Sequence, residues 1–205
     1  MSFRSYRLAS ILILALPVLA QVPSAPGIKN FHQVDQNVYR GAQPAPEGIR
    51  YLGQLGVKVV LDLRRPGERS LEEQRLVTAA GMRYVTVPMS GLKPPTDAEI
   101  ATLLKLLEDP TAGPVFVHCR RGADRTGAVI AAYRIDHQKW DNARALQEAM
   151  ANGMSRLQFP RQRFIRTFRA GSWAASDESA MKAGGGEGSS GGNRPAVAPA
   201  ATSPL

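Results

Sequence analysis

The stretch that decides the fold is His118-Cys119-Arg120-Arg121-Gly122-Ala123-Asp124-Arg125-Thr126-Gly127. An apolar run at 114–117 precedes it and favours a buried strand, and residues 126–135 have a composition that suits a helix. A short loop between a strand end and a helix N-terminus gathers backbone N–H groups and can hold an anion. The stretch therefore predicts an anion-binding loop with a single cysteine, Cys119, at its base.

Three residues of this loop are spaced as phosphoryl transfer through a cysteine requires. The inward N–H dipoles lower the pKa of a thiol at the base of the loop, so we expect Cys119 to be a thiolate nucleophile. Arg125 carries a planar fork that can hold two phosphoryl oxygens, which a lysine cannot do. Thr126 is placed to hydrogen-bond the sulfur and to help it leave. These three residues are the predicted catalytic core.

The rest of the loop is predicted to hold the phosphate. Gly122 permits the tight curvature, since a Cβ there would obstruct the loop. The side chains of Arg120 and Arg121 either attract the anionic substrate or are solvated charges. The predicted phosphate-binding residues are Arg120, Arg121, Gly122, Ala123, Asp124 and Arg125.

No metal or other cofactor is expected. The loop amides and Arg125 already neutralise a phosphoryl group, and the three histidines, His32, His118 and His137, lack the spacing of metal ligands. We expect His118 to have a structural role, with a hydrogen bond to the backbone beneath the loop.

Strand-like and helix-like segments alternate along the chain. The expected strands are 38–40, 57–63, 83–87 and 115–118. The expected helices are 46–55, 71–80, 96 or 97 to 108, one from about 125, 142–150 and 161–169. This order predicts an α/β fold with a mainly parallel central sheet flanked by helices, with ligands at the carboxyl ends of the strands.

The chain resembles the atypical dual-specificity phosphatases of bacteria, plants and fungi. The resemblance rests on the loop, on 30–44 and 56–64 in the N-terminal half, and on 95–168, where the plant and fungal branch is most similar. It implies a dual-specificity phosphatase-like fold and hydrolysis of phosphoesters or phosphoanhydrides. The implied substrates are phosphoproteins, phosphoinositides, inositol polyphosphates or inositol pyrophosphates.

The residue that protonates the leaving oxygen is open between two aspartates. Where many dual-specificity phosphatases have an Asp after a strand, this chain has Met89, Ser90 and Gly91. Asp97, 22 positions before the cysteine (119 − 97), matches an acidic position of the plant and fungal branch, and it could instead cap a helix. Asp124 is the rival, because some secreted bacterial relatives carry an Asp immediately before the loop arginine.

Several other charged residues could either bind substrate or have only a structural or surface role. Asp62 is expected to end the central strand in a structural hydrogen bond. Arg64, Arg65 and Lys93 either read neighbouring phosphates or are solvated. We interpret a basic cluster as the solvent-exposed face of an amphipathic terminal helix; its members are Arg161, Arg163, Arg166 and Arg169. No nucleic-acid binding is expected.

The sequence divides into an N-terminal targeting segment, a domain and a tail. Residues 1–20, with Arg4, Arg7 and an apolar run at 8–19, predict a signal peptide that is cut after Ala20, or else an uncleaved anchor. Residues 21–29 are expected to be a linker, 30–170 the cysteine phosphatase domain, and 171–205 a disordered tail rich in Gly, Ser, Ala and Pro. The protein is therefore expected to be periplasmic or secreted, without a stable membrane span after cleavage.

The net charge and the single cysteine limit the possible functions of the protein. The formal net charge is +9, or +7 (9 − 2) without Arg4 and Arg7, which suits phosphorylated substrates, other polyanions or an anionic membrane face. A single cysteine excludes a disulfide within the chain and disfavours a thiol relay for arsenate reduction. A phosphate-binding pseudophosphatase and a sulfurtransferase remain as alternatives, although Arg125-Thr126-Gly127 argues against the latter. Oligomeric state is left open.

Overall fold

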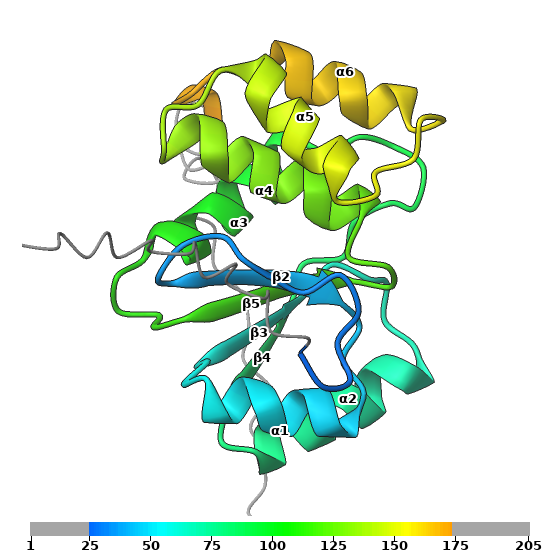
Figure 1. Ribbon diagram of the computed structural model, residues 1–205, viewed down its shortest axis with the longest axis vertical. Coiled ribbons are helices and arrows are strands. Elements are labelled where there is room, and N and C mark those ends of the chain that lie inside the picture. Colours follow the sequence, from blue (N-terminus) through cyan, green and yellow to red (C-terminus); the bar gives the residue numbers. More distant parts are fainter. Residues whose placement is uncertain (1–24, 174–205) are drawn as a thin grey trace, which may run out of the picture.

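A five-stranded sheet forms the centre of the computed structural model, which describes residues 25–173 (Figure 1). Its strands are β1 (His32–Gln33), β2 (Val38–Ala42), β3 (Val59–Asp62), β4 (Arg83–Thr86) and β5 (Val115–Cys119). Their order across the sheet is β1-β2-β5-β3-β4, and all neighbours are parallel except β1 and β2. The predicted α/β fold with a mainly parallel sheet is confirmed.

Helices cover both faces of the sheet. In Figure 1, α1 (Pro46–Gln54) and α2 (Glu68–Ala79) lie below it. The other four lie above it: α3 (Asp97–Glu108), α4 (Asp124–Asp136), α5 (Asn142–Ala151) and α6 (Phe159–Thr167). This three-layer arrangement leaves the carboxyl ends of the parallel strands free to build a site.

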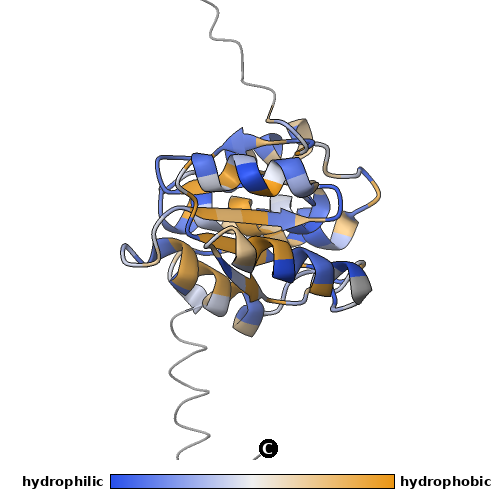
Figure 2. Ribbon diagram, turned by 90° about the horizontal axis from the view of Figure 1, so that it is seen from below, coloured by the Kyte–Doolittle hydropathy of each residue, from blue (hydrophilic) through white to orange (hydrophobic). Residues whose placement is uncertain are grey.

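The central strands are apolar on both faces because each face is covered by helices. On β3, Val59 and Leu61 pack with α3 and α4, while Val60 packs with α1 and α2. The same alternation on β5 places Val117 in the first core and Phe116 in the second. Figure 2 shows orange, hydrophobic residues along the central strands, and both orange and blue residues on the helices that surround them. Continuous apolar strands of this kind are typical of buried parallel sheets.

The first residues of α3 and α2 show how far the sequence could predict where a helix begins. Thr96 caps α3 in a reciprocal arrangement with Glu99, so Asp97 is the first helical residue and not the cap. Helix α2 begins at Glu68, three residues before the expected start at 71, because the Gly67 carbonyl accepts from the N–H groups of Ser70 and Leu71. Gly67 offers no capping side chain, so the sequence gives no signal there.

Within the described residues, packed side chains extend on both sides of 30–170. Ala25 and Ile28, which the sequence interpretation assigned to a linker, are buried against α1. At the other end, Trp173 packs on the core and its indole N–H donates to Asp136 across 2.9 Å. The predicted signal peptide at 1–20 and the tail beyond 173 lie outside the described residues. Within 25–173, no helix combines the length and the apolar character that crossing a membrane requires.

Candidate active site

The predicted loop connects the end of β5 to the start of α4. Cys119 is the last residue of β5, beside Ala42 at the end of β2, and its side chain is only 2% exposed. Residues 120–123 form the loop, and Asp124 opens α4. The cysteine therefore lies at the carboxyl edge of the sheet, where α/β folds place their ligands.

Gly122 allows the loop to pack directly on the end of β2. Its φ is +67°, in the left-handed region, and a Cβ at this position would stand 2.3 Å from the carbonyl carbon of Gly41. Both observations require glycine. The Gly122 carbonyl is held from behind by Arg40 Nη2 at 2.8 Å and Asn30 Nδ2 at 3.0 Å. The backbone of the loop is thus fixed by the body of the protein before any ligand arrives.

The surroundings of Cys119 lower the pKa of its thiol. Burial, the largest contribution, raises the pKa, but several donors together outweigh it: the hydroxyl and the backbone N–H of Thr126, the positive charge of Arg125 and the backbone N–H of Arg121. The Thr126 hydroxyl is buried, and no partner stands in hydrogen-bond geometry to it. Because a hydroxyl hydrogen rotates freely, it can turn to an ionised sulfur. The site favours a thiolate.

Arg125 lies beside the loop with its guanidinium only lightly held. Its Nη1 donates to the carbonyl of Leu63, just beyond β3, at 3.3 Å. The charge of Arg125 acts on the Cys119 sulfur. A guanidinium with a single long hydrogen bond retains its other N–H groups for an oxyanion.

The other loop side chains divide between an exposed and a buried set. Arg120 and Arg121 are exposed, whereas Ala123 is buried at the start of α4. Arg121 forms an ion pair with Asp124. The second carboxylate oxygen of Asp124 accepts from the backbone N–H of Ser155 at 2.8 Å. Asp124 thus fastens the 153–158 segment to the loop.

Asp97 has different surroundings. It is exposed in the first turn of α3, and no hydrogen bond or ion pair engages its carboxylate within the described part of the chain. The structure therefore gives Asp124 two structural partners and leaves Asp97 free, and no distance places Asp97 at the sulfur.

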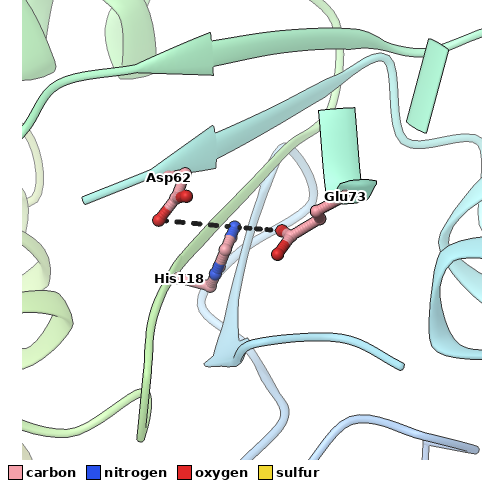
Figure 3. Close-up of side chains that lie close together, drawn as sticks. All are labelled: Asp62, Glu73 and His118. Carbon is pink, nitrogen blue, oxygen red and sulfur yellow. Dashed lines mark ion pairs between the residues drawn. The ribbon is translucent and has the colours of Figure 1, made fainter. Parts of the chain in front are cut away.

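A buried network of charged groups supports the strand that leads into the loop. His118 Nε2 lies 2.9 Å from Glu73 Oε1 and 3.9 Å from Asp62 Oδ1 (Figure 3). The 2.9 Å contact is an ion pair without good hydrogen-bond angles, since neither atom has a hydrogen-bond partner of acceptable geometry. His118 was expected to bond to backbone, and its partners are instead two carboxylates. Glu73, on α2, was not found from the sequence.

The same three residues are spaced closely enough to hold a metal ion, with ligand atoms within 4.8 Å of one another. Arg64 already occupies this place: it donates to both oxygens of Asp62 at 2.7–3.0 Å and to Glu73 Oε2 at 2.6 Å. Tyr84 donates to Asp62 as well, at 2.6 Å. The cluster fits an ion-pair network better than a metal site. Asp62 has the structural role that was predicted for it, and Arg64 is a structural residue as well.

Arg161 is a second buried cation near the site, and sequence reasoning placed it on a solvated helix face. It is fully buried and donates to the carbonyls of Ser90 at 2.5 Å and Gly91 at 3.1 Å. Burial lowers its pKa, while the charges of Asp124 and Cys119 act in the opposite direction. Arg161 therefore joins α6 to the segment between β4 and α3, close to the loop.

An arginine-rich cavity adjoins the loop. It measures about 410 Å³ and is lined by Gln43, Arg64, Arg65, Gly67, Arg69, Ser70 and Arg120. Gln43 and Arg64 follow β2 and β3, and Arg120 follows β5, so the cavity opens where three neighbouring parallel strands end. Arg64 is neutralised by its carboxylates, whereas Arg65, Arg69 and Arg120 form no ion pair within residues 25–173.

Comparison with known proteins agrees with this geometry. A family model described as "DSP-PTPase phosphatase fused to NAD+ Kinase" matches residues 14–167. The dual specificity protein phosphatase TpbA of Pseudomonas aeruginosa (strain UCBPP-PA14) is 33% identical over 125 residues, covering 60% of this chain and 55% of the relative. Inositol diphosphatase DSP3 of Arabidopsis thaliana is 28% identical over 143 residues, covering 68% and 70%. The chain thus spans only about half the length of TpbA.

A solved structure shows the same architecture. The core catalytic domain of the PP-IP phosphatase SIW14 from S. cerevisiae, in complex with citrate, superposes with a TM-score of 0.64 at 25% identity, covering 76% of this chain and 93% of that one. The fold and the loop define the class of cysteine-dependent phosphatases, which are hydrolases. Within that class, the chain belongs to the DSP-PTPase family, with the atypical dual-specificity phosphatases typified by TpbA, SIW14 and the plant inositol diphosphatases.

Proposed function

We propose that this phosphatase hydrolyses phosphate monoesters through a phosphocysteine intermediate formed on Cys119. In the first step the thiolate forms an S–P bond, the P–O bond to the leaving group breaks, and the leaving oxygen takes a proton. In the second step water adds to phosphorus, the S–P bond breaks and phosphate leaves. The observation that carries this proposal is the position of Cys119 at the end of β5, at the base of a loop held by Arg40 and Asn30, with the charge of Arg125 acting on its sulfur.

Each of the other predicted residues has a part in this proposal. Arg125 and the backbone N–H groups of residues 120–125 hold the equatorial oxygens, and Arg125 binds most strongly when charge is spread in the transition state. Thr126 stabilises the sulfur as it leaves in the second step. Asp97 is the better candidate for the proton donor, since both oxygens of Asp124 are engaged.

The test of the mechanism is Cys119→Ser with a generic aryl phosphate. The variant is expected to lose turnover and to retain phosphate binding, because the loop amides and Arg125 remain. Hydrolysis by Cys119→Ser at the wild-type rate would exclude the proposed intermediate.

The proton donor can be identified by its dependence on the leaving group. Asp97→Asn should slow hydrolysis of a phosphotyrosine peptide far more than hydrolysis of an aryl phosphate with an acidic phenol, which needs little protonation. Asp124→Asn should reduce thermal stability and affect both substrates alike. The opposite pattern would assign the role to Asp124.

For the substrate, we propose phosphorylated proteins, with dual specificity for phosphotyrosine and phosphoserine or phosphothreonine. The name of TpbA supports this choice. The second candidate is an inositol polyphosphate or pyrophosphate, which the name of DSP3 supports and which the cavity favours, because Arg65, Arg69 and Arg120 offer three unpaired cations beside the loop. A phosphoanhydride also has a better leaving group and depends less on a proton donor. A phosphoinositide headgroup is a related alternative.

A parallel phosphate-release assay separates these candidates. Wild type and an Arg65→Gln, Arg69→Gln double variant are compared on a phosphotyrosine peptide, an inositol pyrophosphate and a soluble phosphoinositide, with Arg50→Gln on the exposed side of α1 as control. If the cavity reads further phosphates, the double variant raises KM for the inositol compound about tenfold or more and leaves that for the peptide unchanged. Equal effects on all substrates would support the protein phosphatase.

We further propose that the enzyme is exported to the periplasm or secreted. The support is the sequence of residues 1–20, with two arginines before an apolar run and small residues before the expected cut after Ala20. The test is N-terminal sequencing of the protein recovered from a cell fraction outside the cytoplasm. A protein that retains residues 1–20 would indicate an anchor.

A further inference from the structure

Three large apolar side chains near the candidate site are strongly exposed. Leu92, Leu157 and Phe159 are 78%, 80% and 65% exposed. Leu92 lies in the segment between β4 and α3, and the other two lie at the entry to α6. Exposed apolar groups that occur singly need no explanation, but a cluster of them beside a site indicates a surface for a partner.

Arg161 brings the two segments together. Its Nη1 donates to the carbonyl of Gly91, which precedes Leu92, and also to the side chain of Gln158, which stands between Leu157 and Phe159. One guanidinium group therefore contacts the backbone before Leu92 and the side chain of the residue between Leu157 and Phe159. We name Leu92, Leu157 and Phe159 the apolar rim.

The rim is a fixed feature next to the phosphate loop. Gln162 Nε2 donates to the carbonyls of Ser155 at 3.1 Å and Arg156 at 3.0 Å, which holds the backbone just before Leu157. The N–H of Ser155 in turn donates to Asp124 at the end of the loop. The exposure of the rim is thus built by hydrogen bonds and does not come from a loose loop.

The two segments of the rim are positively charged and lack acids. Residues 88–96 and 153–163 contain Lys93, Arg156, Arg161 and Arg163, and no Asp or Glu. Lys93, Arg156 and Arg163 are exposed. The acids that come nearest along the chain are Asp97 and Glu99 at the start of α3, and Asp124 is already engaged by Arg121. An occupant of this surface should carry negative charge around an apolar interior.

We propose that the apolar rim docks the phosphatase on an anionic lipid surface. Leu92, Leu157 and Phe159 would enter the boundary between headgroups and acyl chains, and the three exposed cations would meet lipid phosphates. A lipid surface fits better than a peptide because these side chains protrude, at 65–80% exposure, from two loops and the start of α6, whereas a helical or proline-rich peptide is bound in a groove. Docking would hold the phosphate loop close to substrates at that surface.

The test is co-sedimentation of the full-length chain with phosphatidylcholine vesicles, with and without phosphatidylserine. Wild type should bind the anionic vesicles preferentially, and added salt should weaken this binding because the charges are screened. A Leu157→Glu, Phe159→Glu double variant should lose binding about tenfold or more. The matched control is Leu71→Glu, which changes an exposed leucine on α2, below the sheet.

Two further measurements keep the outcome clear. Because the apolar residues 8–19 can bind lipid themselves, the decisive quantity is the difference between the double variant and Leu71→Glu in the same full-length background. Both should hydrolyse a soluble aryl phosphate at the wild-type rate without vesicles, which separates failure of docking from failure of the phosphatase. If the double variant does not fold, Arg156→Gln with Arg163→Gln takes its place.

Three results would overturn the proposal. The wild type could bind neutral and anionic vesicles equally, or the rim variant and Leu71→Glu could lose vesicle binding to the same extent. The rim variant could also impair only the hydrolysis of a soluble phosphopeptide. The last would assign the rim to a peptide substrate.

Discussion

At the scale of single residues, the chemistry depends on opposing influences on one sulfur atom. Burial of Cys119 raises the pKa of the thiol, and the donors from Thr126, Arg125 and Arg121 lower it by more. All of these donors belong to the folded loop or to the first turn of α4. The reactive thiolate is therefore a property of the native backbone and not of the cysteine alone.

Replacing Thr126 tests this balance. Thr126→Val removes the hydroxyl and keeps the shape, so the pKa of Cys119 should rise, because the thiolate loses a hydrogen-bond donor. The pH profile of Cys119 alkylation should then move to higher pH. Thr102→Val, an exposed change on α3, is the control. An unmoved profile would mean that Thr126 does not act on the sulfur.

Replacing Gly122 tests the packing of the loop on β2. Gly122→Ala places a Cβ against the backbone of Gly41 and Ala42 and strains a left-handed φ, which by itself costs on the order of 1–3 kcal/mol. We expect activity to be lost and the melting temperature to fall by about 5 °C or more. Gly91→Ala meets nothing within 4 Å and should melt like wild type. Normal activity of Gly122→Ala would contradict the described loop.

Sequence reasoning could identify the contiguous part of this site and not its remote part. Cys119, Arg125 and Thr126 are near each other because one loop carries them. Arg40 and Glu73 reach the same region from β2 and α2, and no local pattern marks a residue whose role depends on tertiary contacts. A signal was available at Arg40, which is an arginine in the predicted strand 38–40 and is buried in the structure. Burial lowers its pKa to about 10.

At the scale of secondary-structure elements, α6 organises the surroundings of the loop through its first turn. Arg161 holds the segment after β4, and Gln162 holds the segment before α6. From the sequence, the spacing of arginines at 161–169 indicated only an amphipathic helix. The helix is there, but its first arginine points inward to backbone carbonyls.

Two substitutions separate the charge of Arg161 from its geometry. Because the charges of Arg161 and Cys119 attract each other, Arg161→Gln should raise the pKa of Cys119 and shift the pH profile of kcat/KM to higher pH. Arg161→Lys should restore the profile but not the thermal stability, since an ammonium cannot reach both Ser90 and Gly91 as the planar fork does. Arg169→Gln, on the exposed side beyond α6, is the control. Identical profiles for all variants would remove Arg161 from the electrostatics of the site.

Most helices and strands could be predicted because the spacing of their apolar residues matches the faces that the fold buries. The buried strands 59–62 and 115–119 are continuous apolar runs, and α3 has a capping box. Strand β1 has only two residues, too few for a periodic pattern, and it pairs antiparallel with β2. Its existence depends on β2 having a free edge, which is a property of the sheet.

At the scale of the whole molecule, the buried charges around Asp62 link α2, β3, β4 and β5. Burial raises the pKa of Asp62, but hydrogen bonds from Arg64 and Tyr84 and the His118 charge together bring it below its ordinary value of 3.8. Burial, and then the same hydrogen bond to Asp62, raise the pKa of Tyr84. The sheet therefore depends on Asp62 remaining ionised.

This dependence predicts the direction of acid sensitivity. A carboxyl group with a lowered folded pKa stabilises the fold above its unfolded pKa, and this contribution is lost as the pH falls through the folded value. Thermal stability of the wild type should thus decrease below about pH 4, whereas Asp62→Asn should be less stable at neutral pH and less sensitive to acid. Glu72→Gln, an exposed change on α2, is the control. An equal acid slope in wild type and Asp62→Asn would show that the network does not govern acid unfolding.

The solitary cysteine of this chain also determines its response to oxidants. A thiolate is the form that peroxide attacks, and the first product on Cys119 would be a sulfenic acid. Many redox-regulated enzymes protect that state with a neighbouring thiol, but this sequence has only one cysteine and supplies no such resolving group. Recovery of an oxidised molecule would then depend on a reductant from outside, and without one further oxidation would be permanent.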